Sequence, residues 1–533
     1  MPPSDWKKRW MTAFAVTIGT TTLNGVVNDA DAIEPVIVTA IPLDDPEEVE
    51  ASPSDDTPVA EPVVSPEAMA PVPAAVPCTC CNSTCCTKKK QEAATAAMKG
   101  AYKGLFFDNN FSYLNDPCYN GPSFCGDAFK GLCCNRLDLG GEARVRFHNE
   151  ENIRGLGLTG RDDNFWLTRV RLFANYRMNE YFRFYGEYLY ADSGGETFDN
   201  RPIEENRGEL QNGFVDARLT ESLTFRFGRQ EELYGAQRLV SPLDWANTRR
   251  TFDGAKLLYK GDTWNVDGFF LHPVNRNADT EDKLDDTNEA VDFYGFYATR
   301  GDLAIGTLDA YYLGLNNSIA DFDYHTIGSR VSGSTDGGQL YEFEGGYQFG
   351  KNSPGYGDHS AGFFTAGLGR QLSLCCDQWK PTIWFWYDWA SGGDDIPAAR
   401  GDNGFDHLFP LAHKYLGFMD LYGRRNINDA NVQFITPVMG SKVKLLVWYH
   451  YFFLDQKTTP YSVVMTPFNP DNRAGDRELG HEIDVLFNIS LNPRNSMLVG
   501  YSFFDAGRYY STTPGVPTDA DGQFLYVQYQ TRF

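Results

Sequence analysis

Long apolar runs are missing from this sequence of 533 residues. Beyond the N-terminus, no stretch reaches the roughly eighteen consecutive apolar residues that a transmembrane helix needs. A bundle of membrane-spanning helices is therefore excluded. Strands that cross a membrane alternate apolar and polar residues, so a mean hydropathy of −0.41 still allows a membrane β-barrel.

Positive charge is also scarce. The chain has 47 Lys and Arg against 71 Asp and Glu, and its net charge is −24. Proteins that bind phosphate backbones need clustered positive charge. We therefore expect no nucleic-acid partner.

Signals of catalysis are weak as well. The eight His residues provide material for Ser-His or Asp-His pairs, but no nucleophile motif accompanies them. His148 is interpreted as a hydrogen-bonding group rather than a catalytic base. We expect no enzymatic activity, no cofactor and no metal ion.

Cysteine is almost absent from most of the chain. Nine of the eleven cysteines lie between residues 78 and 134, and only Cys375 and Cys376 lie further on. Disulfides are the default in an exported protein, but the sequence cannot give their connectivity. A soft-metal site is the alternative, although the spacing fits no zinc pattern. We predict a small cross-linked periplasmic segment over residues 78–135, with a short helix near QEAATAAMKGAYKG.

The N-terminus has the pattern of an export signal. Lys7, Lys8 and Arg9 precede a weakly apolar stretch, and Ala30 and Ala32 form a small-x-small cleavage site. We predict a cleaved signal peptide over residues 1–32; a short membrane anchor is the alternative.

The next stretch, residues 33–77, has no Lys or Arg, while it contains ten Pro and ten Asp or Glu. Such a composition cannot bury enough apolar surface to offset the entropy of ordering. We predict a disordered linker.

From residue 136 to residue 533, apolar and polar residues alternate repeatedly, as they do in half-buried strands. In RLDLGGEARVRFHNE, Leu139 and Val145 share one face, while Glu142, Arg144 and Arg146 share the other. This pattern predicts strands of a membrane barrel, with the apolar face toward lipid and the polar face toward an aqueous lumen.

The stretch FWLTRVRLFANYRM is ambiguous, because both of its faces contain apolar residues. Placing Arg169, Arg171 and Arg177 against lipid would cost roughly 2–4 kcal/mol for each Arg near the membrane midplane. Burying Leu167 and Phe173 instead recovers about 1.5–3 kcal/mol each. We therefore expect the arginines to face the lumen and the opposite face to meet lipid; that face consists of Trp166, Val170, Leu172, Ala174 and Tyr176.

About eighteen such segments can be counted, including weaker candidates at YHTIGSRV and NVQFITPV. A barrel of roughly 16–18 strands leaves an open aqueous channel. The final stretch, FLYVQYQTRF, alternates up to Phe533. Every backbone group needs a partner in lipid, so we expect this last strand to close the barrel against the first. A terminal Phe also looks like the signature by which the barrel assembly machinery recognises outer-membrane proteins.

The segment GRQEELYGAQRLVSPLDWANTRRTFDGAKL, residues 228–257, resembles the alginate-export porin family, as do the two strands described above. The resemblance covers roughly residues 137–533 and implies an eighteen-stranded outer-membrane barrel that passes an anionic polysaccharide. The positions that match the family motif, or carry its usual basic residue, are Arg229, Gln230, Arg249, Arg250, Asp253 and Lys256.

A uronate polymer carries carboxylates, and the planar guanidinium of Arg binds a carboxylate through two hydrogen bonds. Inward arginines would form an electropositive constriction that concentrates such a polymer. We expect this lining to comprise the motif residues together with Arg144, Arg146, Arg169, Arg171, Arg177, Arg183 and Arg226.

Two questions stay open at this point. Inward acids, such as Asp138, Glu142, Glu187 and Asp216, could pair with the arginines simply to stiffen the wall. The N-terminal segment, which the simple family pattern lacks, could plug the lumen, reach the cell wall or bind a partner protein. Besides saccharide transport, the alternatives are a general diffusion porin and a cell-surface or wall-anchoring barrel without transport.

Overall fold

The computed structural model describes residues 86–277, 284–335, 337–372, 379–396, 403–440 and 442–533. The chain divides into two units, residues 1–32 and 33–533, and every described residue belongs to the second. The predicted signal peptide, the linker and the cysteines at positions 78, 80, 81, 85, 375 and 376 lie outside the described residues.

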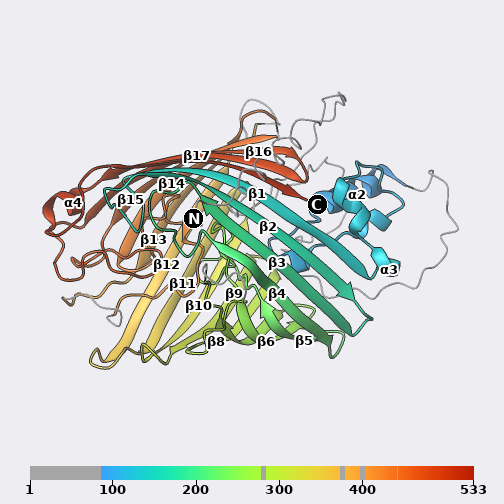
Figure 1. Cartoon of the computed structure of the whole chain (residues 1–533), viewed down its shortest axis with the longest axis horizontal. Helices are drawn as coiled ribbons and strands as arrows, with labels where there is room; N and C mark the ends of the chain where they lie inside the picture. The colour runs from blue at the N-terminus through green and yellow to red at the C-terminus, as the bar shows by residue number, and fades with distance from the viewer. Residues whose placement is uncertain (1–85, 278–283, 336, 373–378, 397–402, 441) are drawn as a thin grey trace, which may run out of the picture. The chain divides into compact units, whose positions relative to one another are not determined.

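Eighteen antiparallel strands form one sheet in which each strand pairs with its neighbour in sequence (Figure 1). The strands are β1 (Leu137–Glu151), β2 (Asp163–Arg177), β3 (Phe182–Gly194), β4 (Asn206–Arg218), β5 (Leu223–Gln230), β6 (Phe252–Lys260), β7 (Asn265–Pro273), β8 (Val291–Leu303), β9 (Gly306–Asn317), β10 (Phe322–Ser334), β11 (Gln339–Lys351), β12 (Asp358–Gln371), β13 (Thr382–Ala390), β14 (Ile427–Pro437), β15 (Val443–Phe453), β16 (Glu478–Asn492), β17 (Asn495–Ala506) and β18 (Gly522–Arg532). The strand count and both weaker candidates, now β10 and β14, are confirmed.

The last strand closes the sheet. β18 pairs with β1 over ten residue pairs, from Glu142 opposite Arg532 to Glu151 opposite Gln523. Phe533 extends the pairing, because its N–H donates to the Gly141 carbonyl at 3.0 Å and its carbonyl accepts from the Gly141 N–H at 2.7 Å. The barrel therefore has no free edge at the chain terminus, as a structure surrounded by lipid requires.

The two faces of the wall differ as predicted. Trp166 and Leu172 are 54% and 44% exposed on the outside, whereas Leu167, Arg169 and Arg171 are buried on the inside. The energetic choice between the two faces of β2 is therefore confirmed. The whole wall follows this rule: large apolar side chains cover the outer face, and most charged side chains of the strands point inward.

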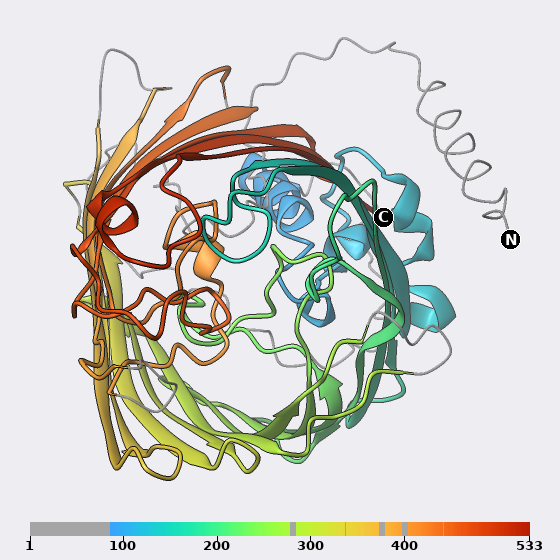
Figure 2. The ribbon, with the colours of Figure 1, turned by 60° about the vertical axis from the view of Figure 1, so that its left-hand side comes forward.

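Connections are short at one end of the barrel and long at the other. Two long connections fold into the lumen, the β5–β6 loop (residues 231–251) and the described residues 403–426 of the β13–β14 loop (Figure 2). They meet where Val240 bridges Phe409, and the Leu411 N–H donates to the Gln237 carbonyl at 3.0 Å. Their apolar residues join inward residues of many strands in one buried cluster. The predicted open lumen is therefore largely filled in this structure.

An N-terminal segment precedes β1 at the end with the short turns. It contains α2 (Lys88–Lys99), the short helices η2 (Phe106–Asp108), η3 (Ser112–Asn115) and η4 (Cys125–Phe129), and α3 (Leu132–Asn135). A disulfide joins Cys86 to Cys118, so cross-linking of this segment is confirmed for one pair. Cys125, Cys133 and Cys134 are free and exposed.

Two further short helices lie in the loops of the long-loop end, η5 (Ala412–Lys414) and α4 (Arg508–Thr512). No helix among the described residues is long and apolar enough to span a membrane.

Candidate functional site: the arginine wall and its inserted loops

The motif at residues 228–257 marks the place where the chain leaves the wall. Gly228 and Gly254 face each other across β5 and β6, and both have positive φ, 130° and 155°. A Cβ atom on Gly228 would lie 2.3 Å from the Gly213 carbonyl oxygen, and one on Gly254 would lie 2.2 Å from the Phe270 carbonyl oxygen. Glycine is therefore required at both positions, where the strands end and the β5–β6 loop enters the lumen.

Three arginines on β1 and β2 hold the tip of that loop. Arg144 donates to the carbonyl oxygens of Asp244 and Ala246 at 2.9 and 3.1 Å, and Arg146 donates to the carbonyl of Trp245 at 2.9 Å. Arg169 donates to the Asp244 and Ala246 carbonyls, each at 3.1 Å. The loop thus presents a ring of backbone acceptors to neighbouring guanidinium groups.

The Asp244 side chain is the anion at the centre of this cluster. Its carboxylate lies 2.9 Å from Arg169 and also pairs with Arg249. Burial alone would raise the pKa of Asp244, but Arg249, Arg169 and Arg144 hold it well below its usual range. The side chain stays 22% exposed, so a carboxylate at this point is bound by guanidinium groups while it still meets solvent.

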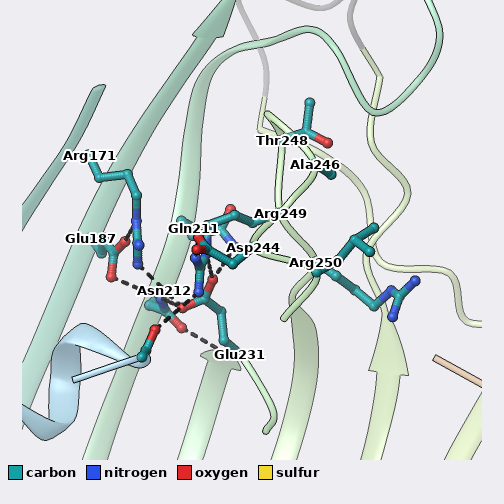
Figure 3. Close-up of polar contacts among 12 residues, drawn as sticks. Arg171, Glu187, Gln211, Asn212, Glu231, Asp244, Ala246, Thr248, Arg249 and Arg250 are labelled. Atoms are coloured by element: carbon teal, nitrogen blue, oxygen red, sulfur yellow. Dashed lines mark hydrogen bonds and ion pairs between the residues drawn. The ribbon is translucent and has the colours of Figure 1, made fainter. Parts of the chain in front are cut away.

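A second network lies beneath the first (Figure 3). Arg171 pairs with Glu187 at 2.6 Å and with Glu231 at 3.5 Å, and Arg249 also pairs with Glu231. Figure 3 shows Arg249 directed toward these residues, whereas Arg250 points away from them. The two adjacent arginines of the motif therefore contact different parts of the lumen.

Arg250 has neutral partners. Its guanidinium donates to the carbonyl oxygens of Ser241 and Pro410, each at 3.3 Å, which ties the two inserted loops together. Burial and the nearby Arg276 lower the pKa of Arg250 to about 9, so it keeps its charge at neutral pH. Among the described residues, Arg144, Arg146 and Arg250 form no ion pair with a carboxylate.

The remaining predicted arginines of the wall are paired with acids. Arg177 lies 2.8 Å from Asp138, while Arg183 and Arg226 share Asp216 at 3.3 and 2.7 Å. All four inward acids considered for wall-stiffening, Asp138, Glu142, Glu187 and Asp216, have an arginine partner. The same arginine side chains therefore face the lumen and form ion pairs within the wall.

The motif residues on β5 and β6 are paired as well. Arg229 holds Asp253 through two hydrogen bonds of 2.9 Å each and also pairs with Glu209. Lys256 lies 2.7 Å from Glu232. Gln230 is buried, and its amide donates weakly to the Gly228 carbonyl at 3.4 Å.

Several inward groups were not predicted. Arg238 in the β5–β6 loop pairs with Glu342 and Glu344 on β11, and Arg424 pairs with Asp388 on β13. Trp245 lies 3.7 Å beneath the Arg146 guanidinium and stacks on His413 with 3.6 Å between ring centroids. The adjacent arginines at positions 424 and 425 repeat the Arg-Arg signal of the motif and could have drawn attention to the second loop.

Other predicted groups are simpler to place. His148 is buried on the inner face, and its ring lies within hydrogen-bonding distance of Glu150 at 3.3 Å, as expected for a structural group. Within the part of the chain that the structure describes, no cluster of His, Cys, Asp or Glu could hold a metal ion.

The Alginate export family model matches residues 135–522. The chain belongs to this family. The match begins just before β1 and ends at the start of β18, so it spans nearly the whole barrel and leaves out the N-terminal segment.

Solved structures with the same fold are distant in sequence. Pseudomonas aeruginosa OccK8 (OprE) is 13% identical, with a TM-score of 0.51 over 76% of this chain and 99% of the other. P. aeruginosa OccK5 (OpdH) is 12% identical, with a TM-score of 0.51 over 75% and 98%. Acinetobacter baumannii OccAB1 is 13% identical, with a TM-score of 0.50 over 74% and 96%. No curated protein matches the chain.

The family and the fold together identify the chain as an outer-membrane β-barrel of a channel family, and that family is not enzymatic. The substrate does not follow from either comparison and has to be inferred from the lumen.

Proposed function

We propose that this barrel passes an anionic polysaccharide or oligosaccharide across the outer membrane. The observation that carries the proposal is the set of three guanidinium groups, on buried Arg144 and Arg146 and on half-buried Arg250, whose hydrogen-bond partners are neutral oxygens. Because carbonyl oxygens carry no net charge, these groups add positive potential to the lumen, and the nearby Asp244 carboxylate is an anion bound in this potential. Uronate carboxylates are ligands of matching charge and geometry.

The contacts of Asp244 support this proposal. Its carboxylate is held by two guanidinium groups while it remains partly exposed. A uronate carboxylate moving along the lumen could make the same contacts in turn. The surrounding wall would then hold these contacts in place. It consists of the paired residues Arg169, Arg171, Arg177, Arg183, Arg226, Arg229, Arg249 and Lys256, together with Gln230 and Asp253.

A general diffusion porin is the second candidate. It is less favoured, because unselective diffusion gives no role to the guanidinium groups that surround the Asp244 carboxylate. A wall-anchoring barrel without transport is the third. In each case lipid surrounds the outer face, the barrel assembly machinery inserts the chain, and the end with short turns faces the periplasm. The N-terminal segment at that end is then the part available to a periplasmic or cell-wall partner.

The test is Arg144→Gln combined with Arg146→Gln. The matched control is Lys88→Gln combined with Lys89→Gln, which removes the same charge from exposed positions of α2. Planar-bilayer recordings should show anion preference for the wild type and the control, and uronate oligomers should block the current through channels that are already open. We expect the lumen variant to lose most of its anion preference and to bind the oligomers at least tenfold more weakly. Equal block by uronate and neutral oligomers in the wild type would reject the anionic substrate.

A further inference from the structure

The N-terminal segment does not stay at the rim of the barrel. Residues 101–115, called the docked segment below, enter the lumen and pack against the inner faces of β2, β3 and β4. Phe106 lies 5.7 Å from Phe173, and Phe107 lies 5.2 Å from Phe214, measured between ring centroids. The buried apolar residues of the docked segment are Ala101, Tyr102, Leu105, Phe106, Phe107, Phe111 and Tyr113.

The docked segment uses the arginines of the wall as its polar partners. The Arg171 guanidinium lies over the Phe106 ring at 3.9 Å, and the Arg226 guanidinium lies over the Phe107 ring at 4.5 Å. Arg183 donates a hydrogen bond to the Phe107 carbonyl, and Arg249 donates one to the Gly104 carbonyl at 3.3 Å. Aromatic rings thus cover two guanidinium faces, and carbonyl oxygens accept from N–H groups of two further arginines, on the side that a saccharide in the lumen would meet.

The base of the docked segment is held differently. Arg494 donates to the Tyr113 hydroxyl at 2.8 Å and to the Met98 carbonyl at 3.4 Å. Tyr113 donates to Asp127 at 3.0 Å, and the Cys86–Cys118 disulfide joins the two ends of the surrounding loop. The base is therefore attached to the barrel through contacts that do not involve the arginines beside Phe106 and Phe107.

We propose that the docked segment is an intramolecular plug of the channel, and that anionic saccharide opens it by competing for Arg171, Arg183, Arg226 and Arg249. The proposal rests on the proposed function, because the competitor must carry carboxylates. The docked segment fills the space beside these guanidinium groups on the lumen side, so the plug and the polymer cannot occupy this part of the lumen together.

The first experiment weakens the tip. Phe106→Ala combined with Phe107→Ala removes both ring contacts, while Phe129→Ala is the control, because Phe129 belongs to the same N-terminal segment but is 50% exposed. Planar-bilayer recordings of the full chain should show at least a threefold higher conductance for the double variant and an unchanged value for the control. A double variant that conducts like the wild type overturns the plug.

The second experiment uses the wild-type chain and does not depend on the folding of a variant. Hydrogen exchange of residues 101–115 is measured in detergent with a uronate hexamer and with a neutral hexasaccharide. We expect loss of protection with the uronate alone, and unchanged protection with both overturns the competition. A double variant with raised conductance but no uronate block would support the plug and count against the proposed substrate. Uronate block combined with an unchanged conductance of the double variant would support the proposed substrate and count against the plug.

Discussion

Two sectors of the inner wall handle buried charge in opposite ways. In the arginine sector, defined as the inner faces of β1–β5, most carboxylates are paired with guanidinium groups, as Glu187 is with Arg171 at 2.6 Å. In the acidic sector, the inner faces of β14–β16, Asp429 and Asp484 lie 2.8 and 3.7 Å from His450. Glu482 accepts a hydrogen bond from the Met419 N–H at 2.9 Å and, among the described residues, has no Lys or Arg partner.

The difference indicates what each sector is for. Buried ion pairs contribute little net stability, because desolvation offsets their attraction, but losing one partner is costly. The arginine sector is therefore a paired scaffold that also holds Arg144 and Arg146, whose hydrogen-bond partners are neutral oxygens. The acidic sector contacts the β13–β14 loop, since Glu482 accepts a hydrogen bond from Met419 of that loop.

The strongest test of this comparison is Arg171→Met. The change keeps side-chain length against Phe106 but leaves Glu187 and Glu231 without this cation, so we expect a loss of about 3–5 kcal/mol in the free energy of unfolding. Urea unfolding in detergent micelles measures it. Arg508→Met is the matched control, because the ion pair of Arg508 with Glu478 is on the surface, and no clear change is expected. Equal stability of both variants would mean that the buried network does not stiffen the wall.

An effect of intermediate size is expected from the titration of Asp108, which lies in the docked segment beside the arginine sector. Burial raises the pKa of Asp108 from 3.8 to about 6, although Arg226 and Arg183 partly oppose this shift. A carboxyl with a raised pKa favours docking in its protonated form, so docking is strongest below about pH 4 and weakens as the pH rises to about 6. Wild-type conductance should therefore rise between pH 4 and pH 7.

The matching variant is Asp108→Asn, which cannot ionise. We expect its conductance to stay low across this range and to equal that of the wild type at pH 4. Identical pH profiles of the two proteins would assign the titration to another group.

The smallest effect is expected for Glu482→Gln in the acidic sector. The amide oxygen can still accept from Met419, and the change breaks no pair with Lys or Arg among the described residues. The free energy of unfolding should change by less than about 1 kcal/mol in urea titrations. A loss as large as that of Arg171→Met would show that the two sectors do not differ in the way described above.

Much of the barrel could be predicted from the sequence, because the pattern that defines each strand lies within that strand. Alternation of apolar and polar residues identified all eighteen strands, and the requirement that a strand in lipid turns its arginines inward placed Arg169 and Arg171 correctly. The resemblance at residues 228–257 indicated the family, but it predicted neither the loop inserted in the lumen nor that Arg249 and Arg250 point to different partners. Their contacts depend on residues as far away as Pro410, which no local pattern connects to them.

The sequence by itself therefore determined the closed barrel, its inward arginines and its family, because strand periodicity and the cost of burying charge in lipid act within each strand. The tertiary structure alone decided which guanidinium groups are neutralised and what fills the lumen. Those outcomes depend on the two inserted loops and on residues 101–115, whose positions are set by packing against distant strands.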